Sequence, residues 1–207
     1  MTTPRDLLIV AMDTVSGHSV DRGDLSLALA GAEAIDLLGA RAIGLDGERI
    51  VPGPPLPLAD RMLDRAASAL TREPPYEPVG EWLWRRGRGL PGAYLDTLEA
   101  DGEAVRERHR RWMVFHTSEL ALVDSSARRR ATHRLRSDEP VLATLATAIG
   151  IHDPSTPDSP AVTRVDDVAT ATVLTAVDDA LGELAVERQR RAERRDAATA
   201  DNVRRGY

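Results

Sequence analysis

Apolar residues recur every three to four positions along most of the chain, which is the period of helices that bury one face. The segments with this pattern are residues 4–13, 24–39, 58–70, 90–102, 125–137, 139–151 and about 165–195. In the second segment, DLSLALAGAEAIDLLG, Asp24 is the expected N-cap and Gly39 the expected stop. Its alanines and glycines let neighbouring elements approach closely, so we expect this helix to lie at the centre of the fold.

Two shorter stretches have the pattern of β-hairpins. In RAIGLDGERIV, residues 41–51, two apolar runs flank Asp46-Gly47, a strong signal for a tight turn. In the second stretch we expect EAVRE, residues 103–107, to pair with WMVFHT, residues 112–117, and Arg108–Arg111 to form the tip.

These elements together predict a mainly α protein. We expect a single helical-bundle domain over residues 1–195, with peripheral amphipathic helices and two small β-hairpins. A flexible C-terminal tail is predicted for residues 196–207. The length of 207 residues suits one domain with a sizeable core.

Composition narrows the possible chemistry. Cysteine is absent, which excludes disulfides, thiol catalysis and thiolate metal sites. The net charge of −6 disfavours nucleic-acid binding through bulk charge. No apolar run is long enough to span a membrane and no basic leader is present, so we expect a cytoplasmic protein. All 27 basic residues are arginine, and they cluster in residues 85–88, 106–111, 128–136 and 188–195.

No catalytic, cofactor or metal site is predicted. His109 and His116 have no metal-ligand spacing with other histidines or acids. The acidic pairs at 166–167 and 178–179 suit helix-dipole complementation and solvation better than acid–base catalysis. Nucleotide-binding, nucleophile-elbow and zinc-protease motifs are absent, so we expect a protein that is not an enzyme.

Two arginine–aromatic segments are candidate binding sites. In EWLWRRGR, residues 81–88, Trp82 and Trp84 adjoin Arg85, Arg86 and Arg88. Forked guanidinium groups beside an indole suit a phosphorylated lipid headgroup at a membrane interface. The alternative is that one tryptophan packs in the core while the arginines are solvated.

The second arginine–aromatic segment is the predicted hairpin in RERHRRWMVF. Its candidate contact residues are Arg106, Arg108, Arg110, Arg111, Trp112 and Phe115. The residues alone leave three interpretations open: a buried strand with a solvated lead-in, a nucleic-acid patch, or a loop that presses on an anionic membrane.

The order of the segments resembles the Golgi phosphoprotein 3 (GPP34) family over residues 4 to about 190. The resemblance rests on DLLIVAMD, then LALAGAEAIDLL, then the RAIGLDGERIV hairpin, and later LDTLEADGEAVRE followed by WMVF. It implies a helical core with peripheral amphipathic helices and a protruding β-hairpin. Eukaryotic members bind phosphatidylinositol 4-phosphate on Golgi membranes and bridge them to the cytosolic tails of glycosyltransferases.

The headgroup pocket that the resemblance implies is only partly retained. Asp21 stands where the family has a tryptophan, and Ala30 where it has an arginine. Of two further arginines in the family, one corresponds to a position near Arg88 and the other to a position near Pro91. The family's hairpin contributes to membrane insertion and self-association, which implies a homodimer through the hairpin.

We therefore expect a non-enzymatic peripheral membrane protein that binds anionic phospholipid, by resemblance phosphatidylinositol 4-phosphate, without a cofactor. The absence of lysine and the lack of a targeting extension suggest a bacterial, actinobacterial member. Two alternatives remain open. One is a nucleic-acid-binding regulatory module with helix 125–137 as its reading element and the hairpin as a wing. The other is a protein–protein adaptor that binds an unknown partner and no lipid.

Overall fold

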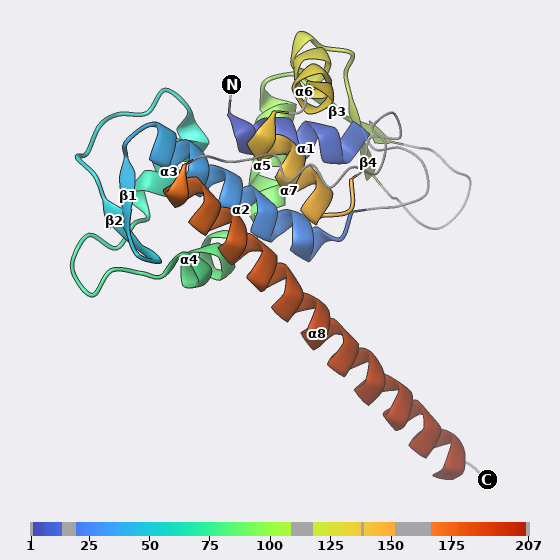
Figure 1. The fold of residues 1–207 in the computed structure, drawn as a ribbon. Helices are drawn as coiled ribbons and strands as arrows, with labels where there is room; N and C mark the ends of the chain where they lie inside the picture. The colour runs from blue at the N-terminus through green and yellow to red at the C-terminus, as the bar shows by residue number, and fades with distance from the viewer. Residues whose placement is uncertain (1, 14–19, 109–117, 138, 152–166, 206–207) are drawn as a thin grey trace.

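The computed structural model describes residues 2–13, 20–108, 118–137, 139–151 and 167–205 (Figure 1). Within these ranges, helices form most of the structure and two antiparallel sheets of two strands each accompany them. The elements are α1 (Thr3–Asp13), α2 (Arg22–Gly39), β1 (Ile43–Asp46), β2 (Arg49–Pro52), α3 (Arg61–Ser68), α4 (Val79–Arg86), α5 (Leu90–Ala100), β3 (Ala104–Arg108), β4 (Ser118–Leu122), α6 (Ser126–Arg136), α7 (Pro140–Ala148) and α8 (Val168–Arg205). The predicted mainly α fold class is confirmed.

Helix α2 is the central element, as its small residues predicted. It contacts α1, α3, α4, α5, α7, α8 and β1, and all residues from Leu27 to Ile35 are buried. The helix begins earlier than predicted, because its cap is Asp21 and not Asp24. The Asp21 carboxylate accepts a hydrogen bond from Gly23 N at 2.7 Å. The helix ends at Gly39 as expected.

The closest approach to α2 is made by α8. A Cβ atom placed on Gly31 would lie 2.4 Å from Cγ2 of Val177, far inside van der Waals contact. Val177 itself is buried in the core. The two helices can therefore cross at this separation only because residue 31 lacks a side chain.

We expect Gly31→Ala to lower the free energy of unfolding by about 1–3 kcal/mol, because the added methyl group overpacks the α2–α8 contact. The matched control is Gly80→Ala in α4, where a Cβ atom meets nothing within 4 Å. That change is expected to stabilise α4 by up to about 1 kcal/mol through helix propensity. Urea denaturation followed by circular dichroism measures both. Equal effects of the two substitutions would contradict the close approach.

The first hairpin forms as predicted. β1 pairs with β2 in the register Leu45↔Ile50 and Asp46↔Arg49. Gly47 occupies the turn with φ +58°, a conformation that suits glycine.

The second hairpin also forms, but its return strand differs from the prediction. β3 pairs with β4 in the register Ala104↔Leu122 to Arg108↔Ser118, so EAVRE does not pair with WMVFHT. Arg108 lies in β3 instead of at the tip, while residues 109–117 lie outside the described residues. The prediction of the return strand was wrong because it chose WMVF, the most apolar run after the arginines. The strand that pairs with β3 is SELAL.

Helix α8 has two parts with different surroundings. Its N-terminal part packs on α2, α4 and α7. Arg188 forms ion pairs with Asp21 and Asp24 at the start of α2. The helix then leaves the body and projects from it as an arm, residues 189–205 (Figure 1). The arm includes residues 196–205 of the segment for which a flexible tail was predicted, and the flexibility of that segment remains a prediction.

Candidate functional site

The two tryptophans of α4 have opposite environments. Trp82 is fully buried in the core. Trp84 is 38% exposed and borders a groove between α4 and the N-terminal part of α8. Four carboxylates and no arginine line this groove among the described residues: Glu48, Glu81, Asp179 and Glu183. The surroundings of Trp84 are therefore negatively charged and repel an anionic headgroup.

Arg86 forms an ion pair inside the protein. Its Nε and Nη2 atoms donate to the two carboxylate oxygens of Glu33, at 2.6 and 2.9 Å. Glu33 is fully buried in α2 and also accepts a hydrogen bond from the hydroxyl of Tyr94 at 3.0 Å. Burial raises the pKa of Glu33, although Arg86 and Tyr94 oppose that rise. Burial and the Glu33 charge raise the pKa of Tyr94. Arg86 thus compensates the buried charge of Glu33. The hydrogen bonds of Glu33 with Arg86 and Tyr94 join α2, α4 and α5.

Arg85 is also engaged. It forms a two-pronged ion pair with Glu77, with Nε–Oε1 and Nη2–Oε2 distances of 2.7 and 2.6 Å. Its guanidinium carbon lies 5.1 Å from the centroid of the Trp82 ring, in cation–π contact. The guanidinium group is partly exposed, so this pair lies at the surface of the α4 region.

Arg88 differs from the other two arginines of this segment. It is exposed, and no hydrogen bond or ion pair joins it to the rest of the described chain. Its turn packs on the first turn of α2, since a Cβ atom on Gly87 would lie 3.0 Å from the carbonyl oxygen of Ser26. Of the five predicted headgroup residues, the structure therefore places only Arg88 as an exposed cation without a carboxylate partner in the described part of the chain.

The positions that the resemblance assigns to the headgroup pocket lie in α2 and its cap, between α4 and α5, and in α5. Asp21 caps α2 and is ion-paired with Arg188. Ala30 is fully buried, and Pro91 is buried in the first turn of α5. Among these positions only Arg88 presents a positive charge.

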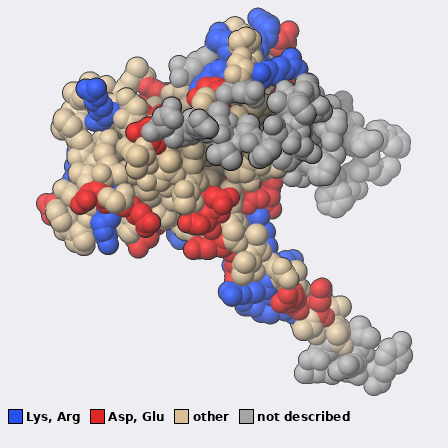
Figure 2. Space-filling view, viewed as in Figure 1, with Lys and Arg blue, Asp and Glu red and all other residues tan. Residues whose placement is uncertain are grey.

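The strongest basic surface of the described residues lies on α6. Ser125 caps this helix, and three of its arginines form ion pairs: Arg128 with Asp13, Arg129 with Asp124, and Arg134 with Asp6 and Glu139. The Arg129 pair is largely exposed, and Arg136 is exposed as well. Figure 2 shows basic side chains gathered over α6.

A groove of about 840 Å³ runs between α6 and the N-terminal half of α1. Arg129, Arg130, His133 and Arg134 line its α6 side. Its floor holds the fully buried carboxylate of Asp6, of which Oδ2 accepts from Arg134 and Oδ1 has no hydrogen-bond partner among the residues that the structure describes. Burial raises the pKa of Asp6 against the effect of Arg134. The arginines at the rim can attract an anion. At the floor, Asp6 already neutralises part of the positive charge of α6.

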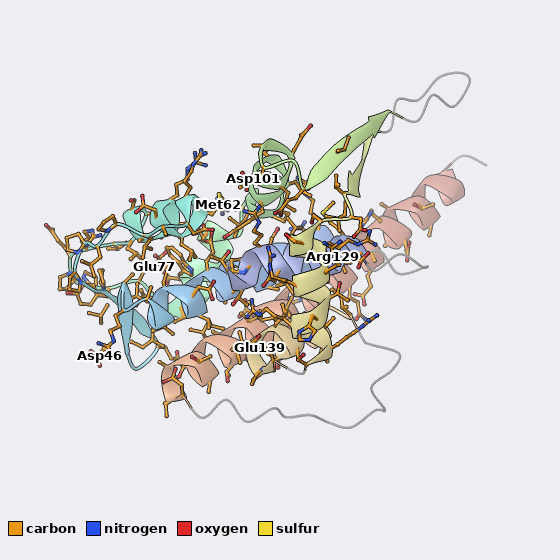
Figure 3. All side chains as sticks on the ribbon, turned by 90° about the horizontal axis from the view of Figure 1, so that it is seen from above. Asp46, Met62, Glu77, Asp101, Arg129 and Glu139 are labelled. Carbon is orange, nitrogen blue, oxygen red and sulfur yellow. The ribbon has the colours of Figure 1, made fainter. Side chains whose placement is uncertain are left out.

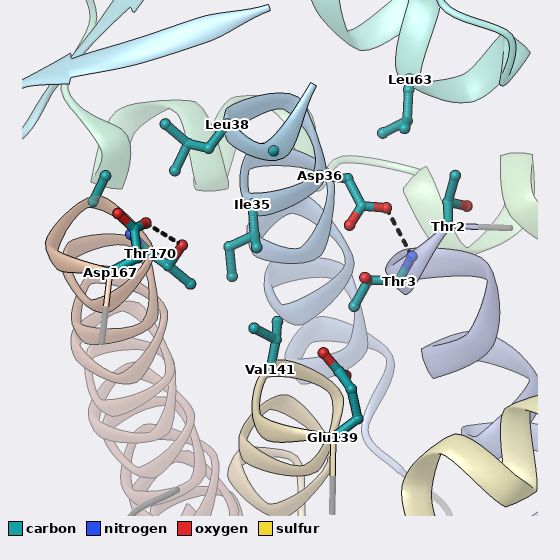
Figure 4. Close-up of a pocket in the computed structure, with 12 residues that line it drawn as sticks. Thr2, Thr3, Ile35, Asp36, Leu38, Leu63, Glu139, Val141, Asp167 and Thr170 are labelled. Atoms are coloured by element: carbon teal, nitrogen blue, oxygen red, sulfur yellow. Dashed lines mark hydrogen bonds between the residues drawn. The ribbon is translucent and has the colours of Figure 1, made fainter. Parts of the chain in front are cut away.

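A second pocket, of about 730 Å³, lies where α1, α2, α7 and α8 meet (Figure 4). Asp36, Glu139 and Asp167 line it, and no arginine does so among the described residues. Asp36 accepts a hydrogen bond from Thr3 N at 2.7 Å, and Asp167 accepts from Thr170. Its acidic lining makes this pocket unsuitable for a phosphorylated headgroup.

The predicted hairpin contacts are described only in part. The backbones of Arg106 and Arg108 lie in β3, opposite Leu120 and Ser118. The other predicted contacts, Arg110, Arg111, Trp112 and Phe115, lie outside the described residues. The hairpin meets α6 at one end of the molecule, because only residues 123–125 separate β4 from α6. Glu77, the partner of Arg85, lies at the opposite end from Arg129 (Figure 3).

The sequence interpretation missed two features. It did not identify Glu33 as a buried charge, although a single acid within the apolar run LALAGAEAI signals a need for a partner. It also treated helix 125–137 only as a nucleic-acid reading element. The connection between this helix and the hairpin is short, and this signal in the sequence could have shown that the two lie next to each other.

Two further findings concern the described residues, and two concern the whole sequence. None of the described helices combines the length and apolar character needed to cross a bilayer. Within the same residues, no group of three or more His, Asp or Glu side chains is placed to hold a metal ion. The family model described as Golgi phosphoprotein 3 (GPP34) matches residues 4–201. No curated protein matches the sequence.

Proposed function

Because the chain belongs to the Golgi phosphoprotein 3 (GPP34) family, we propose that it is a peripheral membrane protein that binds anionic phospholipid headgroups, with phosphatidylinositol 4-phosphate as the candidate lipid. It acts without catalysing a reaction. We propose that the membrane-facing end comprises α6 and the β3–β4 hairpin, with Arg88 as a separate cation on the α4–α5 turn.

The observation that carries this proposal is the joint position of α6 and the hairpin. The exposed guanidinium groups of Arg129 and Arg136 lie on the helix that follows β4 directly. The hairpin itself carries Arg106, Arg108, Arg110 and Arg111 in its sequence. A basic residue close to an anionic leaflet contributes about 1 kcal/mol, so several together give reversible, salt-sensitive attachment.

The test is flotation of the full chain with liposomes of three compositions: phosphatidylcholine alone, phosphatidylcholine with phosphatidylserine, and phosphatidylcholine with phosphatidylinositol 4-phosphate. We expect binding to both acidic compositions at low salt and weaker binding at physiological salt. A preference for the phosphoinositide at equal surface charge would assign a specific headgroup site. Absence of binding to every composition at low salt would refute the proposal.

Charge reversals locate the surface. We expect Arg129→Glu with Arg136→Glu to weaken binding to acidic liposomes by at least about tenfold, because two attractive charges become repulsive. The control is Arg65→Glu with Arg72→Glu, an equal charge change at exposed positions on the α3 side. Arg88→Glu tests the α4–α5 turn without disturbing the ion pairs of Arg85 and Arg86. Equal losses for the α6 and α3 variants would mean that net charge, and not α6, governs binding.

The nucleic-acid alternative has weaker support. Arg128 and Arg134 of α6 are paired with acids of α1, which leaves fewer side chains to meet phosphates. A gel shift with duplex DNA and with RNA at moderate salt is the direct comparison. A complex tighter than that with acidic liposomes would favour this alternative.

A further inference from the structure

The projecting arm of α8 packs against no other element in the described part of the chain. Its described side chains, residues 189–200, are all exposed. The arm has no apolar stripe, and its side-chain contacts among the described residues are local, such as Gln189 with Glu193 at 3.1 Å. A helix that is polar on all sides is stabilised by pairs between its own successive turns or bridges to another element. The arm is therefore a surface that fits a partner.

The charges of the arm have opposite sign to those of the groove beside Trp84. The exposed arginines Arg190 and Arg194 have no ion pair with other described residues. Asp179 and Glu183, on the solvent side of the groove, have none either within the described chain. Figure 2 shows acidic side chains where α8 leaves the body and basic ones on the arm beyond. Helix α8 thus carries both an acidic segment and a basic segment, which are complementary in charge.

The spacing along α8 places these charges on one face. Glu183 and Arg190 are seven residues apart, nearly two full turns, so they lie within about 20° of each other around the helix. Asp179 and Arg194 fall within about 30° of the same direction. Val186, 51% exposed, lies between the acidic and the basic part.

The spacing is also symmetric. The midpoint of α8 lies between Val186 and Glu187. Glu183 and Arg190 are equally far from that midpoint, and so are Asp179 and Arg194. If two α8 helices meet antiparallel at their midpoints, Glu183 and Asp179 of one copy therefore each face an arginine of the other. Because such a pair is two-fold symmetric, every contact between the helices occurs twice.

We propose that two copies of this chain associate through antiparallel α8 helices. The arm of each copy covers the acidic groove of the other, and Glu183–Arg190 and Asp179–Arg194 pair across the interface. This interface differs from a homodimer through the β3–β4 hairpin, and it does not depend on lipid binding. The half-buried Ala176, together with the partly exposed Trp84, provides the apolar surface that the arm covers.

The first test is sedimentation of the full chain over a range of concentrations, at low and high salt. We expect a dimer that high salt weakens. Glu183→Arg and Arg190→Glu should each raise the dissociation constant at least about tenfold, because each places like charges opposite one another twice. The double variant with both changes should return it to within about threefold of the original.

The matched control is Arg195→Glu, the same charge change about 140° around the helix from Arg190. It should leave the dissociation constant unchanged. All substituted positions are exposed, and circular dichroism verifies that each variant keeps its helices. A monomer at every concentration would overturn the proposal. A dimer that the single changes weaken but the double change does not restore would overturn it too.

Cross-linking tests the antiparallel geometry independently, because the chain has no cysteine of its own. Val186→Cys lies beside the two-fold axis and should cross-link to its copy with a short bis-maleimide. Ala176→Cys and Ala197→Cys should cross-link to each other between chains, but not each to itself. Self-cross-linking at all three positions would indicate a parallel pair and refute the proposed arrangement.

Discussion

Replacing Arg86 with methionine should lower the free energy of unfolding by about 3–5 kcal/mol at pH 8, because it leaves the buried carboxylate of Glu33 without its compensating charge. Of its hydrogen bonds within the described chain, Glu33 would keep the one from Tyr94. The matched control is Arg85→Met on the same helix, whose partly exposed pair with Glu77 should cost about 1 kcal/mol. Urea denaturation measures both variants.

The pH dependence of this loss has a defined sign. The pKa of Glu33 is raised in the folded protein, chiefly by burial. A carboxyl group with a raised folded-state pKa contributes its stability fully below the unfolded pKa, and it loses this stability as pH rises through the folded pKa. Without Arg86 the carboxyl group should bind a proton more readily, so the defect should be smaller at pH 5 than at pH 8.

A double variant separates charge from packing. Glu33→Leu with Arg86→Met removes both partners and should recover much of the loss, because no uncompensated charge remains buried. A defect that grows as pH falls would contradict the assignment of Glu33 as a buried ionised group. Equal losses for Arg85→Met and Arg86→Met would show that the two ion pairs have similar roles.

Replacing Trp82 with alanine should cost about 3–5 kcal/mol, since the side chain is fully buried in the core. The substitution also removes the aromatic ring beneath Arg85. Trp84→Ala, two residues further along α4, should cost less than about 1 kcal/mol because that ring is partly exposed. Thermal unfolding monitored by circular dichroism gives the comparison.

A third variant, Trp82→Leu, addresses the predicted headgroup role of Trp82. Trp82→Leu is a milder change that keeps an apolar side chain in the core. Once corrected for the folded fraction, its binding to acidic liposomes should equal that of the unchanged protein. A specific loss of binding by folded Trp82→Leu would instead favour a direct role for this ring at the headgroup.

Much of the fold could be predicted because it depends on local patterns. The apolar period of residues 4–13 and 24–39 reports which face each helix buries, and the turn at Asp46-Gly47 specifies the first hairpin. The start of α2 was misplaced by a few residues because both Asp21 and Asp24 are good caps, and the backbone geometry selects between them. The return strand of the second hairpin was misplaced because strand register depends on partners across the sheet.

The candidate site was less predictable for a physical reason. The sequence by itself determined that arginines cluster, that lysine and cysteine are absent, and which helices are amphipathic. Only the tertiary structure decided which charges are already compensated. Arg86 and Glu33 are 53 residues apart in the chain, but Nε of Arg86 lies 2.6 Å from Oε2 of Glu33. A guanidinium group is available to a ligand only when the fold brings no carboxylate to it, and that depends on which helices pack together.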